Sequence, residues 1–408
     1  VNGYSNSGSD LNNNITAIGR SFSLADSSVI AINNENSKYS NMAYNLNYKS
    51  ILDTAGMELS LDLDYSRFNG DNRTLYDNRF VNYNGPNKAP SYIRNSTPSL
   101  INIKALKADY TLPLNKTMKF EAGIKSSIVK TDNNFRFEEL KSSNWENDVR
   151  RSNQFVYDEN VNAAYTNLNK QFKKTSIQLG LRAEQTNSKG NSITTSKLVE
   201  RSYLDVFPSL FINQTLSKNL DMSFSYSRRI DRPSYDALNP FIYFLDQYTY
   251  NQGNPFLNPQ YTNNYEVSYN YKKTYNLSLN YSLTRDVITE VLLPDTAKKA
   301  LFQTNENLDK QINYGLNLNA PVTLSKWWSS SNNILAYYLG FRSSDLRGQD
   351  LNSGKVAFQV NSQHKFSISK TFSAELMADY RSPIEYGTLK ISSQYGIDLG
   401  ISKTLLNK

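Results

Sequence analysis

Residues 57–65 read Met-Glu-Leu-Ser-Leu-Asp-Leu-Asp-Tyr, so every second side chain in this stretch is apolar. Successive side chains of an extended strand point to opposite faces, and the alternation therefore separates an apolar face from a polar one. Residues 41–48, Asn-Met-Ala-Tyr-Asn-Leu-Asn-Tyr, repeat the pattern, and residues 50–56 join the two stretches. The pattern predicts a β-hairpin in which each strand has one apolar and one polar face.

The same alternation recurs along the chain, and short turns that contain lysine separate the stretches. Apolar residues occupy alternate positions at 220–226, 277–283, 312–318, 372–380 and 397–401. The turns are Leu114–Thr117, Phe172–Thr175, Leu216–Asn219, Tyr271–Thr274, Leu324–Trp327, Ile368–Thr371 and Ile401–Thr404. From Lys116 to Lys370 the turn lysines follow one another at intervals of 44 to 58 residues. Each repeat is therefore a hairpin with one tight end and one long, variable end, as in transmembrane β-barrels.

The mean hydropathy is −0.60, and no apolar run approaches the length of a membrane-spanning helix, about 18 residues. A barrel strand exposes only every second side chain to lipid, so alternation is the relevant signal. At about 3.3 Å per residue and a tilt of about 40°, nine residues span an apolar band of about 25 Å. Aromatic residues beside the turns are typical of an interfacial girdle: Tyr48, Phe120, Phe172, Tyr271, Tyr275, Trp327, Trp328, Phe366 and Phe372. We therefore predict an all-β fold, a large antiparallel transmembrane β-barrel.

The turns also predict the number of strands. Eight tight turns account for fifteen strands and residues 15–32 add one or two, so we expect about 15 to 18 strands in a single barrel domain covering residues 1–408. The last turn, 402–404, has no room for a second strand, which predicts a barrel that is incomplete at its C-terminal edge. A soluble β-sandwich would have about 100 to 150 residues and comparable turns at both ends. A β-solenoid would have shorter repeats of nearly constant length.

The composition disfavours several classes of function. The chain has no cysteine and one histidine, His364, which argues against a zinc site, a haem site and a Ser/His/Asp triad. A lipase would also need a serine within reach of His364, and no motif selects one. The net charge of +8 comes from residues dispersed over turns and loops, without the basic stripe that nucleic-acid binding favours. We predict no enzyme, no cofactor, no metal site and no nucleic-acid partner.

One segment resembles a known family. It reads Arg-Arg-Ile-Asp-Arg-Pro-Ser-Tyr at 228–235, Leu-Asn-Pro-Phe at 238–241, Gly-Asn-Pro-Phe-Leu-Asn-Pro at 253–259 and Asn-Tyr-Glu at 264–266. In this order the pieces resemble part of the barrel of TonB-dependent outer-membrane receptors, most closely the Bacteroidetes-type outer-membrane β-barrel family. Ala163-Ala164-Tyr165 with Leu168, and Gly180–Thr186, support the resemblance, which with the hairpins covers nearly all of the chain.

The resemblance implies residence in the outer membrane of a Gram-negative bacterium, in contact with its lipid. It implies a barrel that imports a scarce nutrient, such as a siderophore, glycan, peptide or metal complex, with TonB-type energy coupling from an inner-membrane protein. Family members also have an N-terminal plug domain, and a surface lipoprotein would be a further partner. A passive porin-like channel or a structural, adhesive barrel is the alternative. The sequence starts at Val1 without an initiator methionine or secretion signal, so we expect a mature chain or an internal fragment that lacks the plug and the final strands.

Two groups of residues are candidates for function. By the resemblance, a polar lumen contacts the plug or lines the path, and the predicted lumen residues are Glu58, Asp62, Asp64, Arg182, Glu184 and Glu266. Tyrosine rings and asparagine amides of the long connection are suited to stack on and hydrogen-bond a sugar or peptide. This predicted ligand set is Arg232, Tyr235, Asn239, Tyr243, Tyr248, Tyr250 and Asn254. The competing interpretation is a structural rim loop, stiffened by its prolines, without ligand contact.

The alternation also predicts sidedness, because a slip of one residue would reverse every side chain. The residues expected to face lipid are Leu59, Leu61, Leu63, Leu277, Leu279, Leu316 and Leu318. The residues expected to face the lumen on the same strands are Glu58, Asp62, Asn280 and Asn317.

Overall fold

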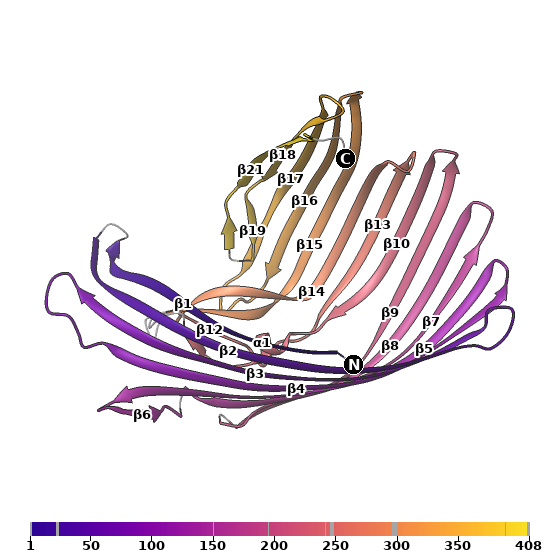
Figure 1. Cartoon of the computed structure of the whole chain (residues 1–408). Coiled ribbons are helices and arrows are strands. Elements are labelled where there is room, and N and C mark those ends of the chain that lie inside the picture. Colours follow the sequence, from indigo (N-terminus) through magenta and orange to yellow (C-terminus); the bar gives the residue numbers. More distant parts are fainter. Residues whose placement is uncertain are drawn as a thin grey trace.

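The computed structural model describes residues 2–21, 24–149, 151–194, 196–240, 242–244, 249–295, 300–387 and 389–405. They form one large, curved sheet and a small two-stranded one (Figure 1). The long strands are β1 (Asn2–Ser21), β2 (Leu24–Ile51), β3 (Glu58–Asn82), β4 (Ser91–Asn115), β5 (Met118–Lys141), β7 (Asn153–Gln171), β8 (Thr175–Ser192), β9 (Lys197–Ser217), β10 (Leu220–Asp231), β13 (Gln260–Tyr271), β14 (Tyr275–Asp295), β15 (Ala300–Ser325), β16 (Trp328–Ser343), β17 (Leu351–Ser367), β18 (Phe372–Arg381) and β21 (Gln394–Lys403). The short elements are β6 (Asn144–Asn147), α1 (Tyr235–Leu238), β11 (Ile242–Phe244), β12 (Thr249–Gln252), β19 (Ile384–Tyr386) and β20 (Leu389–Ile391).

The long strands pair antiparallel in chain order. The ladder runs from β1 to β5, then through β7 to β10, β13 to β18 and finally β21. The predicted all-β antiparallel fold is confirmed, and these sixteen strands agree with the predicted number. Within the described residues, β1 pairs only with β2 and β21 only with β18, so the sheet is not closed.

The short elements lie at the end of the sheet away from the lysine turns. β6 pairs with the end of β5, β11 pairs with β12, and β12 pairs parallel to β15. In Figure 1, α1 and β12 lie within the curve of the sheet. No helix in the described part of the chain is long and apolar enough to cross a membrane.

The strands are longer than an apolar band requires. β2 has 28 residues and β15 has 26. Some of the connections that the sequence predicts to be long are therefore short. Between β8 and β9, for example, the strands are separated only by residues 193–196. Backbone N–H and C=O groups pair whatever the side chain is, so polar residues continue the ladder beyond the leucines. A prediction that ends each strand where apolar alternation stops misses this continuation.

The register shows which side chains share a face. Directly opposite residues lie on the same face, and the partners of Leu61 run to Ala108 on β4 and onward to Ile124 on β5. Followed through the ladder, the register defines an apolar face, which includes Leu59, Leu61, Leu63, Leu277, Leu279, Leu316 and Leu318. The other side, the polar face, includes Glu58, Asp62, Asn280 and Asn317. The two predicted sets thus occupy opposite faces of one sheet.

Local contacts explain the tight turns. Asn115 Oδ1 accepts hydrogen bonds from the backbone N–H of Thr117 at 3.0 Å and from its hydroxyl at 2.9 Å. In the turn after β13, Lys272 and Lys273 both have left-handed backbone conformations, with φ of 53° and 55°, which a tight two-residue hairpin turn requires. The lysine turns therefore share their position and polarity but not one backbone conformation.

The sheet, which we call the wall, has a seam between β9 and β10, where backbone pairing covers only part of the two strands. Their ladder ends at the pair formed by Ser209 and Ser227, although β9 continues along β8 and β10 continues along β13. Beyond that pair only side chains bridge the strands in the described part of the chain. Arg228 Nη1 donates to a carbonyl of β9 at 3.3 Å, and the Tyr261 hydroxyl of β13 donates to Asp205 Oδ2 at 3.0 Å.

Candidate binding surface on the polar face

The polar face carries a continuous track of charged and hydrogen-bonding side chains. On β3, Asp62 accepts a hydrogen bond from Asn47 Nδ2 and lies opposite Lys107 of β4. Lys107 Nζ is 2.5 Å from Asp109 Oδ2. Asp109 in turn accepts a hydrogen bond from the Tyr165 hydroxyl of β7. The track therefore crosses from β3 to β7 without leaving the polar face.

Tyr165 reaches Asp109 by crossing β5 over a glycine. Gly123 lies between them in the ladder, opposite Asp109 on one side and opposite Tyr165 on the other. A Cβ atom at position 123 would lie 2.5 Å from Cζ of Tyr165, closer than real Cβ contacts allow. The ring also lies beneath the guanidinium of Arg182, whose Cζ is 5.2 Å from the ring centroid. Glycine is thus required for the close approach that joins β4 to β7 and β8.

Arg182 and Glu184 continue the track on β8 and connect it to the long loop. Arg182 Nε donates to Glu184 Oε1 at 2.5 Å. From the loop, Arg232 Nη2 donates to Glu184 Oε2 at 2.6 Å and to Thr186 Oγ1 at 2.7 Å. Burial, the largest single effect, opposes the charge of Arg232, but the hydrogen bonds and charges of Glu184 and Tyr203 together outweigh it and raise the arginine pKa above its ordinary value. One largely buried carboxylate is therefore balanced by two guanidinium groups.

The long loop, residues 232–259, packs on the polar face through apolar side chains. Leu238 of α1 and Leu257 form a buried cluster with Phe155 of β7. The ring of Tyr235 lies 5.7 Å from that of Phe155, between centroids. Asn239 Nδ2 donates to the Tyr235 hydroxyl at 3.4 Å. The burial of these side chains holds the loop against β7.

Asn254 ties the far half of the loop to β15. Its Nδ2 donates to the carbonyl of Asn305 at 3.1 Å and to Glu306 Oε2 at 3.2 Å. Its Oδ1 accepts the backbone N–H of Phe256 at 3.0 Å. The side chain of Phe256 is 59% exposed, and sequence reasoning did not select it. Phe256 is therefore an exposed ring on a loop that hydrogen bonds hold to β15.

Tyr250 fixes β12 to β14 and β15. Its ring stacks on Phe302 at 5.4 Å, its hydroxyl donates to Asp295 Oδ2 at 2.8 Å, and the residue is 3% exposed. Burial first, and then the bond and charge of Asp295, raise the pKa of Tyr250 to about 12. Of the other predicted loop tyrosines, Tyr248 and the side chain of Tyr243 lie outside the described residues.

The structure brings some of the predicted residues together and leaves one apart. A single cluster contains Arg182, Glu184 and Arg232. The track connects this cluster to the polar face of β3, which carries Glu58, Asp62 and Asp64. Glu266 is separate, on β13, opposite Ser225 and Asn280.

Three connecting residues were missed by sequence reasoning, namely Lys107, Asp109 and Tyr165. Alternation assigns Lys107 and Asp109 to the polar face of β4. The register that sets Lys107 against Asp62 depends on how β3 and β4 pair over their whole length, and no local signal gives it.

His364 has a serine partner that the sequence did not reveal. Ser362 Oγ lies 3.0 Å from His364 Nε2, while Trp328 Nε1 donates to His364 Nδ1 at 3.1 Å. Because Nδ1 accepts this bond, the proton of the neutral ring is on Nε2, and Nε2 cannot take a proton from Ser362. The Ser362 hydroxyl donates instead to Asn332 Oδ1 at 2.6 Å. In a serine hydrolase the histidine nitrogen that faces the serine accepts the serine proton, whereas the Nε2 that faces Ser362 already carries a proton.

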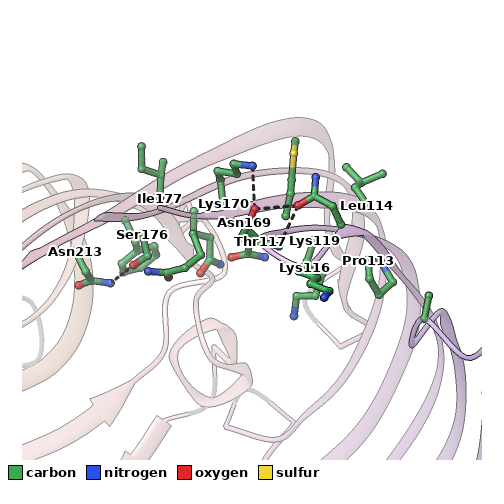
Figure 2. A pocket seen from close by; sticks show the side chains of 16 residues that line it. Pro113, Leu114, Lys116, Thr117, Lys119, Asn169, Lys170, Ser176, Ile177 and Asn213 are labelled. Carbon is green, nitrogen blue, oxygen red and sulfur yellow. Dashed lines mark hydrogen bonds between the residues drawn. The ribbon is translucent and has the colours of Figure 1, made fainter. Parts of the chain in front are cut away.

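A hollow of about 790 Å³ lies beside the tight turns, at the other end of the strands from the loop. Figure 2 shows its side chains, with Lys170 Nζ donating to Thr117 Oγ1 at 3.1 Å on the rim. Its polar-face lining includes Lys119, Asn169, Gln178 and Asn213.

Comparisons with known proteins agree with this architecture. The sequence model described as "Outer membrane protein beta-barrel family" matches residues 50–408. No curated protein matches the chain.

Several solved structures share the fold at low sequence identity. The siderophore receptor PirA from Pseudomonas aeruginosa is 15% identical, with a TM-score of 0.50 over 99% of this chain and 70% of that one. The copper transporter OprC is 10% identical, with a TM-score of 0.54 over 99% of this chain and 72% of that one. The FrpB iron transporter from Neisseria meningitidis is 11% identical, with a TM-score of 0.51 over 98% of this chain and 74% of that one.

Proposed function

Since the chain belongs to the outer membrane protein beta-barrel family and resides in the outer membrane of a Gram-negative bacterium, we propose that it is the barrel of a nutrient receptor. The cargo class would be a siderophore, glycan, peptide or metal complex, and uptake would draw on TonB-type energy coupling. The fold likeness to PirA, OprC and FrpB, whose names give siderophore, copper and iron as cargo, supports this direction.

The observation that carries the proposal is the track on the polar face. A pore that only passes solutes needs a wetted wall, whereas this wall joins its charges across five strands, from Asp62 to Glu184, and attaches a loop to them through Arg232. Glu58 pairs with Lys49 at 2.8 Å and Asp64 accepts a hydrogen bond from Asn45 at 2.7 Å, and both residues are half-buried or exposed on the same face, where a plug domain or a passing solute would also contact them. Such fixed charges suit an internal partner with complementary charges.

The loop is proposed to make first contact with the cargo. Tyr250, Asn239 and Asn254 contact other protein groups, so their part is to hold the loop in place. Tyr235 is half-buried against Phe155, whereas Phe256 is exposed, which makes the ring of Phe256 the accessible aromatic surface of the loop. A rigid loop that presents aromatic rings binds with a smaller loss of conformational entropy than a free one.

A passive or structural barrel is the second candidate, because a polar-faced barrel of this size also suits a porin or an adhesin. We propose no enzymatic function. The hydrogen bond from Trp328 places the His364 proton on Nε2, so this histidine cannot activate Ser362 as a base.

Energy dependence separates the two candidates. In cells that carry the full-length gene, uptake by a receptor should stop when a protonophore collapses the proton gradient or when the inner-membrane coupling protein is deleted. Diffusion through a passive pore should continue under both conditions. Unchanged uptake in both experiments would leave the passive barrel as the better description. Co-purification of the intact protein from membranes would show whether a surface lipoprotein accompanies it.

A further inference from the structure

Three cations stand side by side on the apolar face. Arg285 of β14 is the register partner of Lys310 of β15, and Lys310 is the partner of Arg342 of β16. Alternation fixes their side, because the neighbouring residues Thr284 and Phe341 are buried on the polar face. Arg285 and Arg342 are exposed and Lys310 is half-buried. We call these three residues the cationic row.

The cationic row lies just beyond the apolar part of this face. Four residues closer to the lysine turns, the same three strands carry Tyr281, Tyr314 and Tyr338. Their rings contact one another, with centroid separations of 5.0 Å and 6.2 Å. Four residues correspond to about 13 Å along a strand. Since amphipathic rings favour the membrane interface, the row is placed at the level of the lipid head groups on the side away from the tight turns.

The row has no ion-pair partner in the part of the chain that the structure describes. Within the described residues, none of its three side chains has an acidic oxygen within the 4.0 Å of an ion pair. Other cations of the apolar face do have such partners, for example Lys189 with Glu200 at 2.8 Å. Asp309, next to Lys310 in sequence, accepts the backbone N–H of Ser344 at 2.8 Å, and the charge of Lys310 acts on it without an ion pair.

A row of cations without ion-pair contacts needs a physical explanation. Like charges directly opposite each other on neighbouring strands are destabilising. At this level of the wall an external anion would remove the repulsion. The outer leaflet of a Gram-negative outer membrane consists of glycolipid whose head groups bear phosphates, and two of the three cations are arginines, which bind phosphate through paired N–H donors.

We propose that the cationic row is a binding site for the phosphorylated head group of an outer-leaflet glycolipid. Phosphate oxygens would bridge Arg285, Lys310 and Arg342 across the three strands, and the acyl chains would lie along the tyrosines and leucines below them. The proposal depends on the outer-membrane location and not on the transport role.

The test is lipid binding by the full chain, purified in detergent and folded. Diphosphorylated lipid A is the probe, and native mass spectrometry counts bound molecules and gives their affinity. The variant combines Arg285→Gln, Lys310→Gln and Arg342→Gln. Because each cation near an anionic lipid surface contributes a factor of about five, affinity should fall by roughly 100-fold. The matched control, Lys116→Gln with Lys218→Gln and Lys326→Gln, removes the same charge from exposed tight turns and should bind as the parent does.

Two further arms identify the source of the phosphate. Dephosphorylated lipid A should bind the parent as weakly as the triple variant binds lipid A, and inorganic phosphate should not compete at equal concentration. A heat-modifiable shift on gels checks that each variant is folded, and the single variant Lys310→Gln serves if the triple variant does not fold. Equal binding of lipid A to parent and folded variant, or equal binding of the dephosphorylated lipid, would overturn the proposal.

Discussion

Arg232 in the long loop and Glu184 on β8 form an ion pair with a separation of 2.6 Å, in which the carboxylate also accepts a hydrogen bond from Arg182. The two partners are 48 residues apart in sequence. Their contact attaches the loop to the sheet through one largely buried carboxylate, in addition to the apolar contacts of Leu238 and Leu257 with Phe155.

Replacement of Arg232 by glutamine should release the loop. The variant leaves Glu184 with one guanidinium instead of two, and loss of a partly buried partner is expected to cost roughly 2 kcal/mol. Thermolysin should then cut within residues 232–259 roughly 30-fold faster than in the parent. The control Lys189→Gln breaks an exposed pair with Glu200 and should leave the cleavage rate nearly unchanged. Equal cleavage of both variants would mean that the apolar contacts alone hold the loop.

Gly123→Ala should weaken the sheet where the track crosses β5. The added Cβ would displace the Tyr165 ring and break its bond to Asp109, at an expected cost of about 1–3 kcal/mol. Urea titration of the protein folded in lipid vesicles measures the change. Gly400→Ala is the control, since its Cβ would meet its nearest neighbour at an ordinary 3.9 Å. A Gly123 variant as stable as the Gly400 variant would contradict the required close approach.

Leu61→Arg tests the assignment of faces. If Leu61 contacts lipid near the bilayer midplane, an arginine there should destabilise the folded state by about 2–4 kcal/mol. Ser60→Arg, one residue away on the polar face, should be tolerated, since it lies opposite Asp109. Folding into lipid vesicles, followed by the gel shift in increasing urea, compares the two. The reverse order of stabilities would exchange the two faces.

The docking of β12 should depend on pH through Tyr250. Its pKa of about 12 in the folded protein lies above the ordinary value of 10.0, so the folded state retains the phenol proton longer than the undocked state. The contribution to stability is therefore complete below pH 10 and is lost as pH rises through 12. With tyrosine labelled at ¹³Cζ, the resonance that disappears in Tyr250→Phe should titrate near pH 12. In Asp295→Asn its midpoint should fall, because the repelling charge is gone while the burial remains. A midpoint near 10 in the parent would exclude the buried, acid-paired state.

The faces and the tight turns could be predicted from the sequence because both depend on local patterns. Residues 57–65 specify their two faces by alternation alone, and the register confirms that these faces continue across the sheet. The prediction of a long loop was wrong between β8 and β9, which continue as polar strands and leave only residues 193–196 between them. Hydrophobic alternation cannot detect such strands, because backbone pairing stabilises them.

The candidate site was predictable only in pieces. The sequence identified Glu184 and Arg232 separately, as a wall residue and a loop residue. The contact between Glu184 and Arg232 depends on the packing of Leu238 and Leu257 against Phe155. That packing follows from the tertiary structure alone. The cationic row likewise needs the register, since Arg285, Lys310 and Arg342 are unremarkable surface residues when they are read one by one.

The seam between β9 and β10 gives the wall an uneven mechanical strength. Between the tight turn and the pair of Ser209 and Ser227, separation of β9 from β10 would have to break a whole run of backbone hydrogen bonds. On the other side it would have to break only side-chain links such as that between Tyr261 and Asp205. A lateral force should therefore separate β9 from β10 first at the rim, and the separation should stop at Ser227, where backbone pairing begins. The loop, held over that rim by the pair of Arg232 and Glu184, sets the force at which the separation begins.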